Sequence, residues 1–67
     1  MTYTHYQVLR VEVEQLSNIG LLLQNVKDDL LNEIDQLQLA DKCGSLSALY
    51  IENKYNELEN KIYSYEP

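Results

Sequence analysis

The residues of this chain that could perform chemistry are few, and their spacing does not suit a reaction site. The single histidine, His5, and the single cysteine, Cys43, cannot supply the ligand set of a zinc site. No Ser, Cys or carboxylate stands at a triad-like position relative to His5, and no glycine-rich loop is present to hold phosphate. The sequence therefore predicts no metal, no cofactor and no small-molecule substrate.

Carboxylates are the most concentrated polar groups, in a run formed by Asp28, Asp29, Glu33 and Asp35. Paired carboxylates perform acid–base catalysis only in a pocket that shifts their pKa values. A rod of two helices offers no such concavity, so we expect no enzymatic activity. The run has two interpretations: a solvated helix face, or an acidic patch that imitates phosphate and occupies a basic, nucleic-acid-binding surface of another protein.

The elements that position these groups are indicated by leucine, which recurs at every seventh residue of the first half of the chain. This spacing produces a continuous apolar seam on one face of an α-helix. Isoleucine and valine widen the seam, and we expect it to form a protein interface through Leu9, Leu16, Ile19, Leu23, Val26, Leu30, Ile34 and Leu37. Leu23 stands at its middle, so a charge there is expected to prevent folding or association.

The pattern predicts an all-α fold, a single domain over residues 1–67. We expect a coiled-coil-like antiparallel hairpin with a long helix over about 5–41 and a shorter helix over about 46–65, assembling into a helical bundle. Lys42 suits the helix end, Gly44 the left-handed position after it, and Ser45 the start of the next helix. A weak point at residues 17–20, which end in Gly20, leaves open whether the first helix breaks there.

Self-association or a partner subunit is expected to provide stability. The chain has 67 residues and no disulfide or metal staple, and small chains gain only about 3–5 kcal/mol from one core. The apolar face of the first helix is also too broad for the second helix to cover. Two copies crossing antiparallel at Gly20 would pair Glu12 of one with Lys27 of the other; alternatively, both side chains reach solvent at the edge of the seam.

The formal net charge of −6 limits the class of partner. Carboxylates repel phosphate, which argues against direct binding of nucleic acid and against an anionic membrane surface. The longest aliphatic run, 21–23, is far too short to span a bilayer, and the N-terminal residues contain no signal peptide. A free thiol in such a chain indicates the cytoplasm.

Tyrosine is the only aromatic residue and is enriched in binding surfaces. Tyr55 and Tyr65 lie on the apolar stripe of the second helix and are expected at the edge of the core. Tyr3, Tyr50 and Tyr63 lie off that stripe or near an end, where they are candidates for contact with a partner.

The expected layout resembles the small co-chaperones of bacterial type III secretion needle subunits, with local similarity over residues 26–31 and 57–62. The first helix departs from that pattern by running well past the acidic run before it turns. The resemblance implies a role beside a larger helical-repeat chaperone, keeping an aggregation-prone filament subunit soluble in the cytoplasm.

Two functions that consist of binding another protein are consistent with the sequence, and a purely structural bundle with no client is a third possibility. The first is a chaperone, co-chaperone or adaptor that offers its apolar helix face to a helical client, as a homodimer or in a hetero-complex. The alternative is a small inhibitor or antirepressor, of the type encoded by mobile elements, whose acidic face blocks a basic target protein. The identity of the partner and the pathway are not encoded in these patterns.

Overall fold

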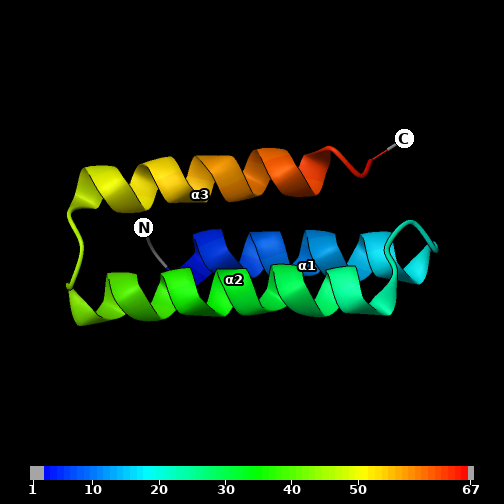
Figure 1. The fold of residues 1–67 in the computed structure, drawn as a ribbon, viewed down its shortest axis with the longest axis horizontal. Helices are drawn as coiled ribbons and strands as arrows, with labels where there is room; N and C mark the ends of the chain where they lie inside the picture. Colours follow the sequence, from blue (N-terminus) through cyan, green and yellow to red (C-terminus); the bar gives the residue numbers. More distant parts are fainter. Residues whose placement is uncertain (1–2, 67) are drawn as a thin grey trace.

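The computed structural model describes residues 3–66, Tyr3 by its backbone only, and contains three helices in this range. They are α1 (Tyr3–Asn18), α2 (Gln24–Cys43) and α3 (Ala48–Tyr63), and each runs antiparallel to the one before it (Figure 1). The longest dimension is 35 Å, whereas a continuous helix over 5–41 would be about 55 Å long. The all-α prediction is confirmed, but the two-helix hairpin is wrong because its long helix is two helices.

The first helix ends at Asn18, and Gly20 in the turn that follows has a left-handed backbone with φ of 81°. The Gly20 amide donates to the Ser17 carbonyl at 3.1 Å, and the Leu21 amide donates to the Leu16 carbonyl at 3.0 Å. These two bonds form a Schellman motif, which satisfies the carbonyls that a helix end leaves open. The chain then reverses through residues 21–23, and α2 begins at Gln24.

Gly20→Ala should lower the free energy of unfolding by about 1–2 kcal/mol, because a β-carbon disfavours the left-handed backbone. A clash is not the reason, since no atom lies within 4 Å of a β-carbon built at Gly20. Gly20→Asn should cost less, because Asn tolerates this conformation. Urea titration followed by circular dichroism measures both. In a continuous helix, Gly20→Ala would instead stabilise by about 1 kcal/mol, and that sign would contradict the broken helix.

The second turn uses the same device at Gly44, whose φ of 67° confirms the predicted left-handed position. Its amide donates to the Asp41 carbonyl at 3.2 Å, and the Ser45 amide donates to the Ala40 carbonyl at 3.4 Å. The prediction that Ser45 caps the next helix is wrong, because the Ser45 amide is hydrogen-bonded to a carbonyl at the end of α2. Ser47 is the cap of α3, and its hydroxyl accepts a hydrogen bond from the Tyr50 amide at 3.2 Å.

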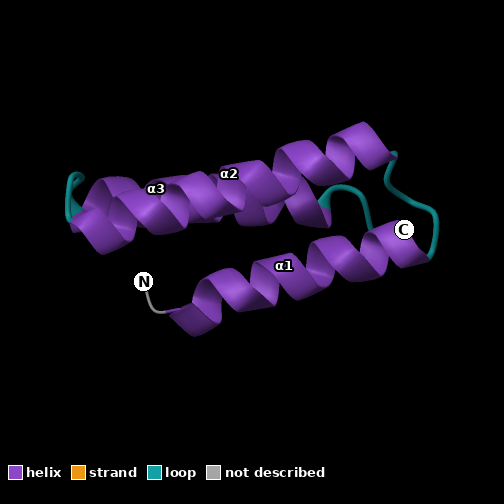
Figure 2. Cartoon of the chain, turned by 90° about the horizontal axis from the view of Figure 1, so that it is seen from below, coloured by secondary structure: helices purple, strands orange, loops and turns teal. Residues whose placement is uncertain are grey.

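The core lies between the three helices and contains residues from all of them. Figure 2 shows α1 to one side of the α2–α3 pair. The main buried cluster is Tyr6, Leu9, Val13, Leu16, Leu22, Leu30, Ile34, Tyr55, Leu58 and Ile62. Because α1 folds back on α2, one chain buries most of the broad apolar face for which a second molecule was expected, while Ile19 and Leu23 stay exposed. Self-association stays a prediction.

Candidate protein-binding surfaces

The predicted interface seam is divided between the core and the surface. Leu9, Leu16, Leu30 and Ile34 are buried within the chain. Val26 and Leu37 are half-buried against that core. Ile19 is 66% exposed and Leu23 is 71% exposed, because both lie at the turn between α1 and α2. The placement of Leu23 at the middle of a buried seam is thus wrong, since the turn removes it from the helix face.

The proposed antiparallel crossing at Gly20 is also contradicted by the turn. Gly20 is no longer within a helix that a second helix could cross. Lys27 pairs with Glu14 of the same chain, with 3.2 Å between Nζ and Oε2. Glu12 lies instead on the α1–α3 side, near Glu66. Glu12 and Lys27 lie at similar distances from Gly20 in the sequence, but they do not pair with each other in the fold.

The four residues of the acidic run on α2 have different environments. Asp35 binds Arg10 of α1, with 2.6 Å between Oδ1 and Nη2, and Glu33 binds Lys61 of α3 at 3.2 Å. Asp28 Oδ1 accepts a hydrogen bond from the side-chain Nε2 of Gln24 at 3.0 Å, and Asp29 is exposed. Two of the four charges thus join α2 to its neighbours, which reduces the negative potential that this run presents to a partner.

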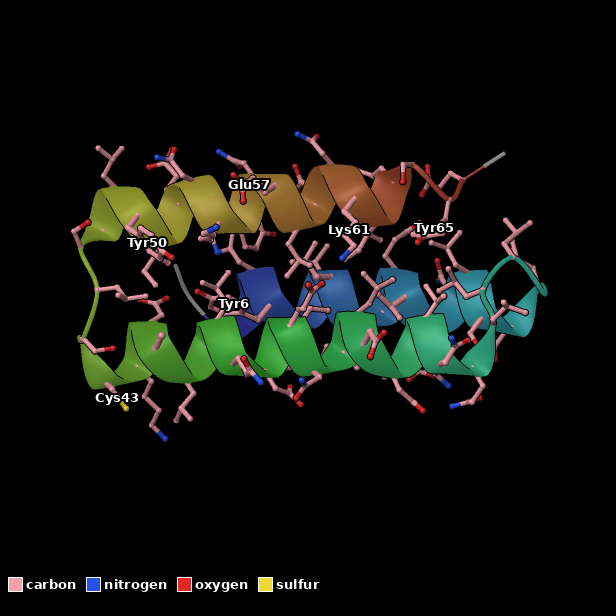
Figure 3. The ribbon with its side chains drawn as sticks, viewed as in Figure 1. Tyr6, Cys43, Tyr50, Glu57, Lys61 and Tyr65 are labelled. Atoms are coloured by element: carbon pink, nitrogen blue, oxygen red, sulfur yellow. The ribbon has the colours of Figure 1, made fainter. Side chains whose placement is uncertain are left out.

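A groove of about 410 Å³ lies between α2 and α3. Its apolar lining comes from Leu37, Ala40, Leu46, Tyr50 and Leu58. Figure 3 shows Tyr50 and Lys61 on the side of α3 that is turned toward α2. Leu46 is 41% exposed and Tyr50 is 45% exposed, so apolar and aromatic surface is available at one end of the groove.

The rim of this groove carries both signs of charge. Its acidic lining residues are Glu33 and Glu57, and its basic ones are Lys54 and Lys61. Lys61 reaches across to Glu33, and Lys54 lies 3.4 Å from Glu57. The groove consequently presents an apolar floor with a nearly neutral edge. Such a surface favours an apolar occupant over a strongly charged one.

A second hollow, of about 510 Å³, lies at the opposite end of the bundle, between the end of α1 and the chain that follows α3. Leu16 and Ile19 provide its apolar lining, while Glu12 and Glu66 are its charged residues. The pKa of Glu12 is raised, first by a hydrogen bond shared with the Glu66 carboxyl and then by burial and by repulsion from Glu66. This hollow therefore differs from the groove in having only negative charge.

The interior contains a polar contact that the sequence did not suggest. Tyr6 is buried, and its hydroxyl donates to Asp41 Oδ2 at 2.7 Å, joining α1 to α2. This bond lowers the pKa of Asp41, while burial raises the pKa of Tyr6. Tyr55 stands edge-on to Tyr6, with ring centroids 5.9 Å apart, and its hydroxyl donates to the His5 carbonyl at 3.1 Å. These contacts fasten the three helices together.

The tyrosines predicted to contact a partner have separate positions. Tyr50 lines the α2–α3 groove, and Tyr63 is partly exposed elsewhere on α3. The side chain of Tyr3 lies outside the described residues. Sequence reasoning missed Leu46, which lies in the loop before α3 and lines the groove together with Tyr50. No periodic signal in the sequence indicates this residue.

Within the described range, 3–66, no group of His, Cys, Asp and Glu side chains is arranged to hold a metal ion. None of the helices there has the length and apolar character needed to cross a bilayer. The thiol of Cys43 is exposed at the end of α2. No model of a protein family matches the chain, and comparisons with curated proteins and with solved structures give no match either.

Proposed function

We propose that this protein is a non-enzymatic binding module of the cytoplasm that acts as a chaperone, co-chaperone or adaptor for another protein. The observation that carries the proposal is the α2–α3 groove, which combines an apolar floor with exposed Leu46 and Tyr50. The proposed occupant is one amphipathic helix of the partner, lying along the groove with its apolar face inward.

The partner is expected to supply apolar side chains at helical spacing and little net charge toward the groove. The rim of the groove is nearly neutral, so electrostatic attraction contributes little to binding. Burial of apolar surface provides most of the affinity. A helical filament subunit that aggregates when alone, as the type III co-chaperone resemblance implies, would present such a face. The two-helix layout on which that resemblance partly rested is replaced by three helices, so the local sequence similarity is what remains of it.

Replacing Leu46 should test the groove without disturbing the core, because Leu46 lies in the loop before α3 and is 41% exposed. Tagged wild-type protein and its Leu46→Asp variant are expressed in the native cells, and captured partners are quantified by mass spectrometry. We expect Leu46→Asp to reduce capture of the specific partner by at least about tenfold, because a carboxylate cannot be desolvated against an apolar face.

Leu39→Asp is the matched control, since Leu39 is an exposed leucine, 61% accessible, that does not line the groove. This variant should retain the partner. Binding by apolar contact should also survive raised salt, which weakens exposed charge pairs. Equal loss of the partner in the two variants would contradict the groove as the binding site.

A further inference from the structure

The side of the bundle between α1 and α3 is the least closed of its three sides. These two helices contact each other less than either contacts α2. Apolar side chains remain exposed in this region, among them Ile19 at 66% and Tyr63 at 41%. The hollow lined by Glu12, Leu16, Ile19 and Glu66 opens on the same side. The α1–α3 side of the bundle is thus a partly apolar surface that no other element of the chain covers.

Negative charge dominates this face. Glu12 and Glu66 line the hollow together, and none of the described residues lining it is basic. The pKa of Tyr63 is raised, first by burial and then by the charges of Glu59, Glu12 and Glu66. Carboxylates this close repel each other unless a proton or a cation lies between them.

The chain has few cations of its own to offer this face. Of its five basic side chains, four already pair with carboxylates of the same chain. They are Arg10, Lys27, Lys54 and Lys61. A second copy of this protein is therefore a poor occupant. Nucleic acid and anionic lipid are also excluded, because their phosphates would meet the same carboxylates.

We propose that the α1–α3 face binds a basic amphipathic helix of a different protein, with an Arg or Lys side chain between Glu12 and Glu66 and apolar side chains over Ile19. Arg suits this position because its planar guanidinium donates hydrogen bonds in two directions and tolerates partial burial. This surface is separate from the α2–α3 groove, so the proposal goes beyond the proposed function and does not depend on it.

The test uses the whole chain, labelled with ¹⁵N, and a synthetic amphipathic peptide of Leu and Arg about five helical turns long. We expect peptide-induced shifts in the amide signals of Glu12, Ile19, Tyr63 and Glu66. A peptide in which Glu replaces each Arg should not bind. Shifts confined to residues of the α2–α3 groove would overturn the proposal while leaving the groove as a binding site.

The double variant Glu12→Gln with Glu66→Gln should weaken binding of the Leu/Arg peptide by about tenfold, since both carboxylates that face the cation are lost. These changes are isosteric and remove a repulsion, so the variant is expected to fold, which its circular dichroism spectrum verifies. The control is Asp28→Asn with Asp29→Asn, which removes the same charge from the outer face of α2.

The control double variant should change the affinity for the peptide by less than about twofold, through long-range attraction alone. An equal loss in the two double variants would show that only net charge attracts the peptide, and would overturn the site. Ile19→Ser, at an exposed position in the turn, should also weaken binding because it removes the apolar contact. Unchanged affinity in that variant would overturn the role of the apolar surface.

Discussion

Ile34→Asp should leave the protein unfolded, whereas Leu23→Asp should leave it folded. Ile34 is fully buried between the helices, with 0% exposure. An unpaired carboxylate there costs several kcal/mol, comparable with the whole stability of about 3–5 kcal/mol available to so small a core. Circular dichroism at 222 nm and thermal melts measure the outcome directly.

Leu23 provides a matched control because it is also an aliphatic residue of the heptad pattern, yet it is 71% exposed in the turn. Leu23 is also the N-cap residue of α2 and makes no side-chain capping bond, so Asp there should leave the free energy of unfolding unchanged or raise it by about 0.5–2 kcal/mol. A single long helix would bury Leu23 at the centre of its seam and give the opposite result. Loss of helicity in both variants would therefore contradict the three-helix arrangement.

Tyr6→Ala should be the next most damaging change, with a loss of about 3–5 kcal/mol. The ring of Tyr6 is 1% exposed and contacts the Tyr55 ring edge-on, so its removal leaves a cavity. Tyr6→Phe keeps the ring and removes only the hydroxyl that donates to Asp41. We expect that variant to lose about 1.5–3 kcal/mol at pH 7, the range for a hydrogen bond to a charged group.

The pH dependence of the Tyr6→Phe penalty identifies Asp41 as the partner. The Tyr6 hydrogen bond holds the pKa of Asp41 below its usual value, so its contribution to stability is present above the unfolded pKa of aspartate. That contribution is lost as the pH falls through the lower pKa of the folded state. Chemical denaturation of wild type and Tyr6→Phe across this range should show the two stabilities converging in acid. A penalty that is constant with pH would contradict the assignment.

Helix content and the position of the second turn were predictable from the sequence because local signals determine them. Gly44 follows a run of helical periodicity and precedes two serines, and its left-handed conformation was predicted correctly. The apolar stripe of α3, with Ile51, Tyr55, Leu58 and Ile62, is buried as its three- and four-residue spacing indicated.

The break at Gly20 could be suspected but not decided from the sequence. The heptad spacing of leucine continues across residues 19–23 without a change of register, so one long helix and two shorter helices have the same pattern. What distinguishes them is tertiary: folding α1 back places Leu9 and Leu16 in the same core as Leu30 and Ile34. That gain in burial outweighs the few helical hydrogen bonds lost at the turn.

The candidate binding surfaces were less predictable than the fold, for the same reason. The strongest apolar pattern in the sequence predicts an interface, but a chain that folds back uses this pattern for its own core. The α2–α3 groove depends instead on Leu46 and Tyr50, which flank the start of α3 and are too few to form a periodic signal. The negative potential of the acidic run likewise depends on ion pairs with Arg10 and Lys61, which are distant from the run in the sequence.

Site-specific photo-crosslinking in the native cells shows whether a partner helix occupies the α2–α3 groove. A benzophenone amino acid is introduced at position 46 or 50 in the groove, and at position 39 on the outer face of α2 as the control. We expect crosslinks from both groove positions, and none from position 39, to apolar residues spaced three or four apart in one segment of one protein. Crosslinks of equal yield from position 39, or groove crosslinks scattered over unrelated proteins, would contradict a partner helix in the groove.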